Sequence, residues 1–520
     1  MRSKPLILVA LLLAAFLVNL DTTLVNVALP AMVRQLHATT TDLLWVVDSY
    51  NLVFAALLLA FGGLSDRFGR KGMLLAGLAV VGTASLAGGF TTDPAQLIAA
   101  RSVMGLGAAM TFPATLSLIS NVFTERRERA RAIGLWGAVA GVAIAMGPIV
   151  GGWLLEHFSW ASIFIAMAPV AAAAAVLVAL AVPTSKDPDA AALDLPGLVL
   201  SSTAMALLIF TIIEAPTYGW AAARSLAGFT ASAVLLTAFI ARERHAARPM
   251  LDVRLFRNMR FSAASGAVTV SFFTLFGFIF LITQYFQFVR GYAPLSAGVR
   301  LLPVALSVGV GSVAGTQVAV RAGTKLVVTA GLVAMAGFYG WVAATASATL
   351  SYGVIAAQMV VYGLGMGLTS APATESIMGA ISRAKAGVGS AVNDSTRLVG
   401  GTLGAAVIGS VYASVYGSRL TATMPTSVPG PVAAIAHQSV GAAYAAAGQI
   451  AALGHPALGL ALQHASTNAF LRGLIIGALV AGAVAAVGAV LAVLFLPAQP
   501  ASTAAEEADI QAQSARPATR

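Results

Sequence analysis

Apolar runs of about twenty residues, separated by short polar segments, recur along the whole of this 520-residue chain. A bilayer core about 30 Å thick needs roughly 20 apolar residues to be crossed by a helix. On that rule the pattern predicts fourteen spanning helices, and therefore an all-α integral membrane protein. The predicted spans lie near residues 6–27, 44–64, 73–90, 97–119, 133–155, 162–182, 198–213, 221–240, 261–283, 298–320, 326–345, 350–370, 388–412 and 470–496.

The order of these runs predicts four parts. Residues 1–182 form a bundle of six spans, residues 183–260 hold two further spans and a basic loop, and residues 261–499 form a second bundle of six. Between the last two spans, residues 413–468 are rich in Ala, Gly, Pro and Ser. This segment is too long for a tight turn and predicts an outer loop with a helix or hairpin of its own, lying on the membrane surface. The polar residues 500–520 are expected to form a disordered tail.

Composition excludes several classes of protein. The chain has 58% hydrophobic and 9% charged residues, whereas soluble proteins carry about 25% charged residues. The absence of cysteine excludes disulfides and cysteine-based metal sites, and the six histidines show no paired spacing. We therefore expect no metal site.

The distribution of basic residues predicts the orientation. If the N-terminus is inside, 22 of the 30 Lys and Arg residues lie on the inner side and five on the outer side. Because cytoplasmic loops are enriched in Lys and Arg, both termini of this multi-pass protein are expected on the cytoplasmic side of the cell inner membrane. Topology explains the net charge of +11 better than nucleic-acid binding, which needs a basic face on a soluble domain.

The sequence Gly-Gly-Leu-Ser-Asp-Arg-Phe-Gly-Arg-Lys at residues 62–71 is the most specific motif of the chain. Gly62 and Gly69 permit a sharp turn between closely packed helices. Asp66 can accept hydrogen bonds from Arg67, Arg70 or a neighbouring helix N-terminus. The segment resembles the loop between the second and third helices of major facilitator superfamily transporters. The resemblance implies a conformational gate, whereas an ordinary basic turn would explain only the positive charges.

In the first span, Asp21 places a carboxylate past the membrane midpoint, where an ionised group is costly. A buried carboxyl group can bind and release a proton. The segment from Leu20 to Pro30 resembles the first helix of the fourteen-helix drug:proton antiporters, the EmrB/QacA-like multidrug exporters. Asn26 lies five residues further on. The alternative is that Asp21 only holds helices together through hydrogen bonds.

Arg101 lies more than one turn inside the fourth span, ahead of Gly105 and Gly107. The resemblance implies that an arginine at this position takes part in proton coupling. A buried arginine needs a carboxylate or carbonyl partner, and Asp21 is a candidate. The alternative is that Arg101 extends to the outer surface.

The fifth span carries glycines spaced for close helix packing, followed by a proline that can kink the helix. This pattern resembles the motif characteristic of exporters within the superfamily, although small-residue packing by itself does not indicate the direction of transport. The positions concerned are Gly137, Gly141, Gly147, Pro148 and Gly151.

In the second half, residues 284–298 resemble the family's link between the ninth and tenth spans, and residues 387–404 resemble its thirteenth span. Asp394 and Arg397 are three residues apart and can pair on one helix face, either for proton coupling or as a structural ion pair.

Two further carboxylates are proton-coupling candidates. Glu375 lies at the inner end of the twelfth span, either at the mouth of the substrate cavity or simply in contact with water. Glu214 ends the seventh span at the outer face, where a solvated position is expected.

The resemblance implies two pseudo-symmetric bundles around a cavity that opens to each side in turn. The candidates for polar groups of that cavity are Asn26, Tyr50, Gln284, Gln287 and Asn393. We expect a monomeric carrier, not an enzyme, that exports a small amphiphilic or cationic compound in exchange for protons. No nucleotide-binding loop is present in the sequence, so the proton gradient, with no cofactor, is the expected energy source. Export of one endogenous metabolite or lipid, proton-coupled import, and a sensor or channel are the alternatives.

Overall fold

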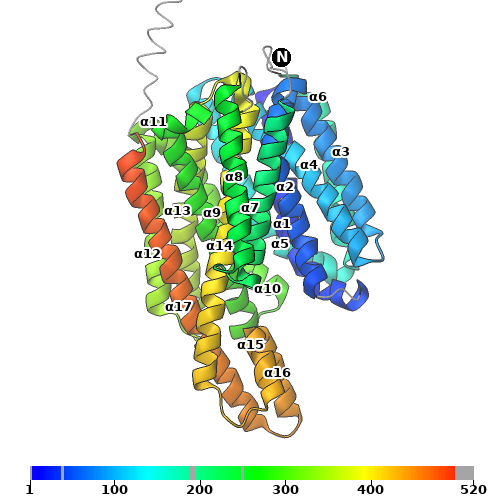
Figure 1. The fold of residues 1–520 in the computed structure, drawn as a ribbon, viewed down its shortest axis with the longest axis vertical. Coiled ribbons are helices and arrows are strands. Elements are labelled where there is room, and N and C mark those ends of the chain that lie inside the picture. The colour runs from blue at the N-terminus through cyan, green and yellow to red at the C-terminus, as the bar shows by residue number, and fades with distance from the viewer. Residues whose placement is uncertain (1–2, 37–39, 187–193, 247–250, 252, 498–520) are drawn as a thin grey trace, which may run out of the picture.

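The computed structural model describes residues 3–36, 40–186, 194–246, 251 and 253–497 (Figure 1). In this part of the chain the regular structure is helical, and fourteen helices are long and apolar enough to cross a bilayer. The predicted fold class and number of spans are confirmed. The tail predicted at residues 500–520 lies outside the described residues.

The first eight helices follow the predicted apolar runs. They are α1 (Lys4–Leu36), α2 (Thr40–Phe68), α3 (Arg70–Gly89), α4 (Pro94–Val122), α5 (Arg126–His157), α6 (Ala161–Ala181), α7 (Leu195–Tyr218) and α8 (Ala223–His245).

The remaining α-helices include three short ones that the apolar runs did not predict, α10, α15 and α16. The set is α9 (Met259–Gln284), α10 (Pro294–Val299), α11 (Leu302–Ala322), α12 (Thr324–Thr345), α13 (Tyr352–Gly379), α14 (Ala386–Thr423), α15 (Gly430–Gln438), α16 (Val440–Ala452) and α17 (Pro456–Phe495). Short helical turns at Val253–Arg257, Tyr285–Val289 and Arg383–Lys385 connect some of them.

Two hydrophobic cores organise the molecule. Helices α1 to α6 enclose one and form the N-terminal bundle, and α9 to α17 enclose the other and form the C-terminal bundle. Helix α7 packs against α2 of the first bundle and α14 of the second, and α8 pairs with α7. The two extra helices therefore cover the boundary between the bundles (Figure 1).

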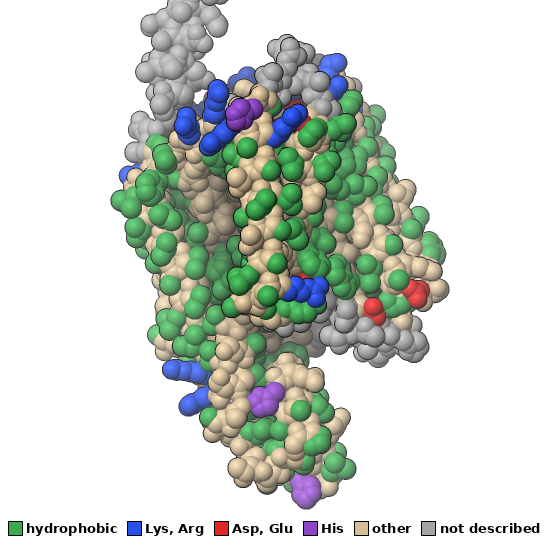
Figure 2. All heavy atoms as spheres, in the orientation of Figure 1, with side chains coloured by type: hydrophobic (Ala, Val, Ile, Leu, Met, Phe, Trp, Pro, Cys, Tyr) green, Lys and Arg blue, Asp and Glu red, His purple; other side chains and the backbone are tan. Residues whose placement is uncertain are grey.

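Basic side chains gather at the end of the molecule where the N-terminus lies (Figure 2). This end, called the basic end here, carries the turn between α2 and α3, the first turn of α5 and the last turn of α8. The opposite end is called the far end.

At the far end, two helices continue beyond the others. Helix α14 has 38 residues and α17 has 40, so they measure about 57 and 60 Å, well beyond the roughly 30 Å of a bilayer core. Helices α15 and α16 pack beside them, and the Tyr416 hydroxyl donates to the Ala436 carbonyl at 3.0 Å. The predicted surface-lying loop at residues 413–468 is instead a helical extension along the long axis (Figure 1), because its small apolar residues bury against the helix ends.

Candidate functional site

A buried ion pair joins the first and fourth helices. Arg101 Nη1 on α4 lies 2.6 Å from Asp21 Oδ2 on α1, and both residues are at most 3% exposed. Arg101 Nε donates to the Val46 carbonyl at 3.0 Å, and the guanidinium lies 4.3 Å from the centre of the Tyr50 ring. The expected pairing is present, and the alternative that Arg101 reaches the outer surface is wrong.

Close packing of α2 and α4 makes this pair possible. A Cβ atom on Gly105 would lie 2.5 Å from the Tyr50 carbonyl oxygen, so only glycine lets the two backbones approach. Asp21 stands seventeen residues after the first residue of α1, Lys4, which places it about 25 Å from the basic end. Since a buried charge without its partner is costly, the pair ties α1 to α4, and the Val46 carbonyl and the Tyr50 ring add contacts from α2.

A second buried pair lies on α14. Arg397 Nη1 is 3.7 Å from Asp394 Oδ1, on the same helix face. Asn393 donates to Asp394 Oδ1 at 3.1 Å and accepts from the Thr374 hydroxyl at 3.0 Å. Among the described residues, neither Asp394 Oδ2 nor Arg397 Nη1 has a hydrogen-bond partner. The pair is therefore loose, unlike the Asp21–Arg101 pair.

Glu375 lies between the two bundles and is buried, so it is not simply in contact with water. It is 3% exposed, and its carboxylate oxygens are 3.7 Å from Arg129 Nη2, 3.9 Å from Arg260 Nη2 and 4.0 Å from Arg126 Nε. Arg126 and Arg129 come from α5 of the N-terminal bundle, whereas Glu375 and Arg260 come from the C-terminal bundle. The cluster therefore ties the bundles together at the basic end.

Glu214 lies near the far end of α7 and is half-buried, not fully solvated. Asp48 on α2 is close enough to repel it electrostatically. Asp48 was not among the sequence candidates, although it is a charge inside a predicted span and the reasoning applied to Asp21 could have found it.

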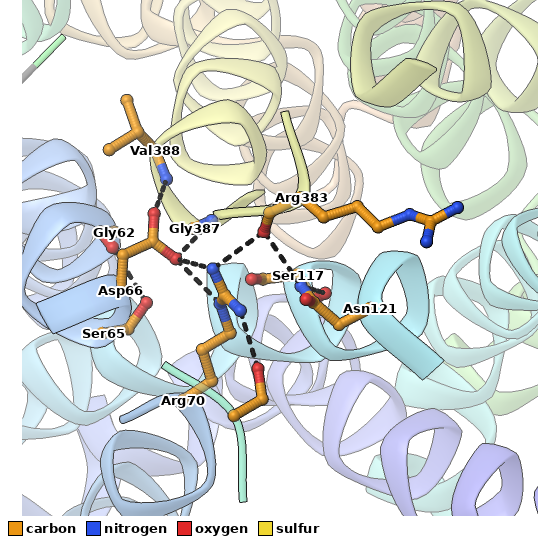
Figure 3. Close-up of polar contacts among 10 residues, drawn as sticks. Gly62, Ser65, Asp66, Arg70, Ser117, Asn121, Arg383, Gly387 and Val388 are labelled. Carbon is orange, nitrogen blue, oxygen red and sulfur yellow. Dashed lines mark hydrogen bonds and ion pairs between the residues drawn. The ribbon is translucent and has the colours of Figure 1, made fainter. Parts of the chain in front are cut away.

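Asp66 and Arg70 form the centre of a contact at the basic end (Figure 3). Arg70 Nε donates to Asp66 Oδ1 at 2.8 Å, and the backbone amides of Gly387 and Val388 donate to the same carboxylate at 2.8 and 3.1 Å. These amides belong to the first turn of α14, where a helix favours a negative charge. Both partners expected for Asp66, an arginine and a helix N-terminus, are therefore present.

The carbonyl group of Arg383 extends this contact to α4. It accepts from Arg70 Nη2 at 3.0 Å and from Asn121 Nδ2 at 3.3 Å (Figure 3). Arg383 Nη2 also donates to the Thr124 carbonyl at 3.0 Å. Arg70 Nη1 also donates to the Ser185 hydroxyl at 2.6 Å. The basic end is thus closed by hydrogen bonds between the two bundles.

The two glycines of this motif serve different purposes. A Cβ atom on Gly62 would lie 2.5 Å from the Ala391 Cβ atom, so Gly62 permits close approach of α2 and α14. Gly69 has open space and a φ of 112°, so it permits the turn itself and not the close packing expected from the sequence. Arg67 lies over the Phe68 ring at 5.4 Å, away from the centre of the contact.

The small residues of α5 connect it to both bundles. A Cβ atom on Gly141 would lie 2.8 Å from a Val308 methyl group on α11, and Gly137 also faces α11. Gly147 lies against Thr23 of α1, and Pro148 packs against Gly298 of α10. Gly151 is buried in the same helix. The predicted close packing is present, and its main partner belongs to the other bundle.

The structure does not bring together the four candidate cavity residues whose side chains it describes. Tyr50 lies beneath Arg101, and Asn393 is fully buried against Asp394. Gln284 is half-buried and donates to the Phe280 carbonyl at 3.3 Å, and Gln287 is exposed in the turn after α9. Asn26 belongs to α1, but its side chain is outside those that the structure describes.

Comparisons with known proteins agree with this architecture. The family described as Major Facilitator Superfamily matches residues 11–405. The multidrug efflux pump LfrA of Mycolicibacterium smegmatis is 35% identical over 441 residues, 85% of this chain and 86% of that protein. The tetracenomycin C resistance and export protein of Streptomyces glaucescens is 33% identical, over 99% of this chain and 96% of that protein.

Solved structures share the fold. The human organic anion transporter MFSD10 aligns with a TM-score of 0.62 at 13% identity, covering 95% of this chain and all of that chain. The proton:xylose symporter XylE aligns with a TM-score of 0.60 at 14% identity, covering 95% of each chain. At these identities the likeness concerns the fold alone.

Proposed function

Because the chain belongs to the major facilitator superfamily, we propose that it is a carrier that exports amphiphilic or cationic drugs or antibiotics across the cytoplasmic membrane in exchange for protons. Relatives named as efflux and resistance proteins support export, at 33–35% identity over most of the chain. The observation that carries proton exchange is the buried Asp21–Arg101 pair. The even number of spans and the charge of the basic end support a cytoplasmic position for both termini.

The pair supplies a reason for protons and cations to compete. With Asp21 ionised, the pair with Arg101 is neutral overall, and a cation nearby meets no net repulsion. When a proton binds the Asp21 carboxylate, the ion pair with Arg101 loses its negative member and the site carries a net positive charge. Charges in a low-dielectric interior interact strongly, so protonation favours release of a cationic substrate.

Alternating access also requires that each end of the carrier can close and open again, and the closed basic end supports this. Opening it requires the amides of α14 to leave Asp66 and the arginines of α5 to leave Glu375. These groups lie far from Asp21 along the helix axes, so they serve the conformational change and not the binding of protons. One chain supplies both bundles, and the proposed transport unit is a monomer.

Transport of a fluorescent lipophilic cation by the purified protein in proteoliposomes, driven by an imposed pH gradient, tests the proposal. We expect Asp21→Asn to abolish gradient-driven transport and Glu156→Gln, which changes an exposed carboxylate on α5, to retain it. Transport by Asp21→Asn that still follows the gradient would remove Asp21 from the mechanism. Accumulation in place of extrusion would show an importer, and a response to one compound of a broad panel would show a specific exporter.

A further inference from the structure

Three aromatic rings enclose the guanidinium of Arg397. Its Cζ atom lies 4.4 Å from the ring centre of Phe272, 4.7 Å from that of Trp136 and 5.3 Å from that of Phe112. We call these three side chains the aromatic cage. Each is at most 6% exposed. The Trp136 indole is fixed by donation to the Thr115 hydroxyl at 3.1 Å, so the cage is preorganised.

The cation inside the cage is poorly satisfied by its own counter-ion. Arg397 is 7% exposed, and at 3.7 Å its contact with Asp394 is too long for a good hydrogen bond. Arg397 Nη1 and Asp394 Oδ2 are both without hydrogen-bond partners among the described residues. A desolvated cation is attracted strongly to the face of an aromatic ring. The guanidinium is therefore held largely by the rings.

The cage lies at mid-depth and between the bundles. Phe112 and Trp136 belong to α4 and α5, whereas Phe272 and Arg397 belong to α9 and α14. Each lies ten to thirteen residues from the basic-end terminus of its helix, which is about 15–20 Å. A cation crossing the membrane between two rocking bundles must pass this level.

A continuous row of rings connects the cage to the Asp21–Arg101 pair. The Tyr50 ring beneath Arg101 is 5.9 Å from Phe54, which is 6.0 Å from Phe112, which is 5.2 Å from Trp136. The two buried arginines therefore lie at opposite ends of one packed row. A change at one end can reach the other through side-chain packing.

We propose that the aromatic cage is the binding subsite for the positive charge of the substrate, a lipophilic cation such as a quaternary ammonium or arylphosphonium ion, and that Arg397 occupies it when no substrate is bound. This inference rests on the proposed function, because it assumes a transported cation. On binding, the cation takes the place of the guanidinium among the rings. Arg397 then turns toward Asp394, where Nη1 and Oδ2 can complete their hydrogen bonding. Aromatic cages of this kind suit cations that cannot donate hydrogen bonds.

The test measures binding of tetraphenylphosphonium to the full-length protein in lipid nanodiscs by calorimetry. We expect Arg397→Met to tighten binding about tenfold because the competing cation is gone, and Trp136→Leu to weaken it about tenfold because a ring face is lost. The matched control is Arg300→Met. The Arg300 guanidinium lies 3.9 Å from the Tyr292 ring centre, outside the cage, so this variant should bind as the native protein does.

A neutral ligand of similar shape, triphenylphosphine oxide, separates charge recognition from damage to the fold. We expect its affinity to be the same in the native protein, Arg397→Met and Arg300→Met, and to fall less than that of tetraphenylphosphonium in Trp136→Leu, which loses packing surface as well as a ring face. Suppose that the native protein binds and transports tetraphenylphosphonium and that Arg397→Met and Trp136→Leu bind it with unchanged affinity. This result would overturn the proposal that the cage binds the substrate and would leave the proposed function intact. Native protein that exports neutral amphiphilic compounds but neither binds nor transports a cation would overturn the cage alone. Native protein that exports no compound of a broad panel would overturn the proposed function itself. If Arg397→Met does not fold, Trp136→Leu alone decides the question.

Discussion

At the scale of single residues, Arg101 makes three different contacts with its buried surroundings. It pairs with Asp21, donates to the Val46 carbonyl and lies over the Tyr50 ring. Removing one member of a buried pair typically costs 3–5 kcal/mol, because the other charge stays buried without a partner. The pair therefore predicts a non-additive response to substitution.

We predict that Arg101→Met lowers thermal stability strongly and that Asp21→Asn combined with Arg101→Met restores much of it. The double variant no longer buries an unpaired charge, so its loss should be smaller than the sum of the two single losses. Thermal unfolding of the three variants in the same detergent checks this. Additive losses would mean that the two charges act independently.

The sequence could predict this pair because each member is a charge in an apolar run, and such charges need partners. Glu375 was also visible, but its three arginine partners were not, because they come from two helices that only the packing brings together. The aromatic cage was invisible for the same reason. Phenylalanine and tryptophan are common in membrane spans, and nothing in the local sequence marks three of them as neighbours.

At the scale of helices, α2 and α14 meet at the basic end with no room for a side chain on Gly62. Gly62→Val would push against Ala391 and the Gly387 carbonyl, both of the C-terminal bundle. We predict that this substitution favours a state open at the basic end. Because the chain has no cysteine, spin labels on introduced cysteines at Phe68 and Ala322 can report the distance between the bundles, which should lengthen.

The matched control for that experiment is Gly72→Val. Gly72 lies in α3 near the same end, and a Cβ atom there would have nothing within 4 Å. The label distance should stay as in the native protein. Equal distances in the native protein and Gly62→Val would show that this contact does not hold the basic end closed.

The first turn of α14 and the carboxylate of Asp66 form one unit, since two amides and Arg70 donate to it. Asp66→Ala removes the hydrogen-bond acceptor but changes no contact of Asp21 or of the aromatic cage. We predict that turnover falls several-fold while the dissociation constant of the substrate changes little. Transport rates in proteoliposomes and equilibrium binding, measured on the same preparation, separate the two. A large loss of affinity with normal turnover would contradict a gating role.

Helix packing was only partly predictable from the sequence. The glycines of α5 predicted close packing, but α11 could not be identified as their main partner, because any smooth helix face would fit them. A helix or hairpin was expected between the last two spans, but the continuation of α14 and α17 into that segment was missed for a different reason. Its Ala- and Gly-rich composition is only weakly apolar, so it gave no spanning signal, and the helices form through contacts such as that between Tyr416 and Ala436.

At the scale of the whole molecule, the charge distribution predicts how the protein lies in the membrane. Basic residues gather at one end and the helical extension projects from the other. Because cytoplasmic loops are enriched in Lys and Arg, the basic end should face the cytoplasm and the extension should stand outside. Two exposed positions report on this directly: Leu453 in the extension is 79% exposed and Phe68 at the basic end is 66% exposed.

We predict that a membrane-impermeant maleimide labels Leu453→Cys in intact cells but labels Phe68→Cys only after the membrane is permeabilised. For a cell with an outer membrane, spheroplasts take the place of intact cells. The native chain has no cysteine and gives the zero level for both measurements. Labelling with the opposite pattern would invert the topology, and protons would then have to enter from the basic end. The closed contacts around Asp66 and Glu375 would in that case face outward, and export would require the far end, not the basic end, to admit the substrate.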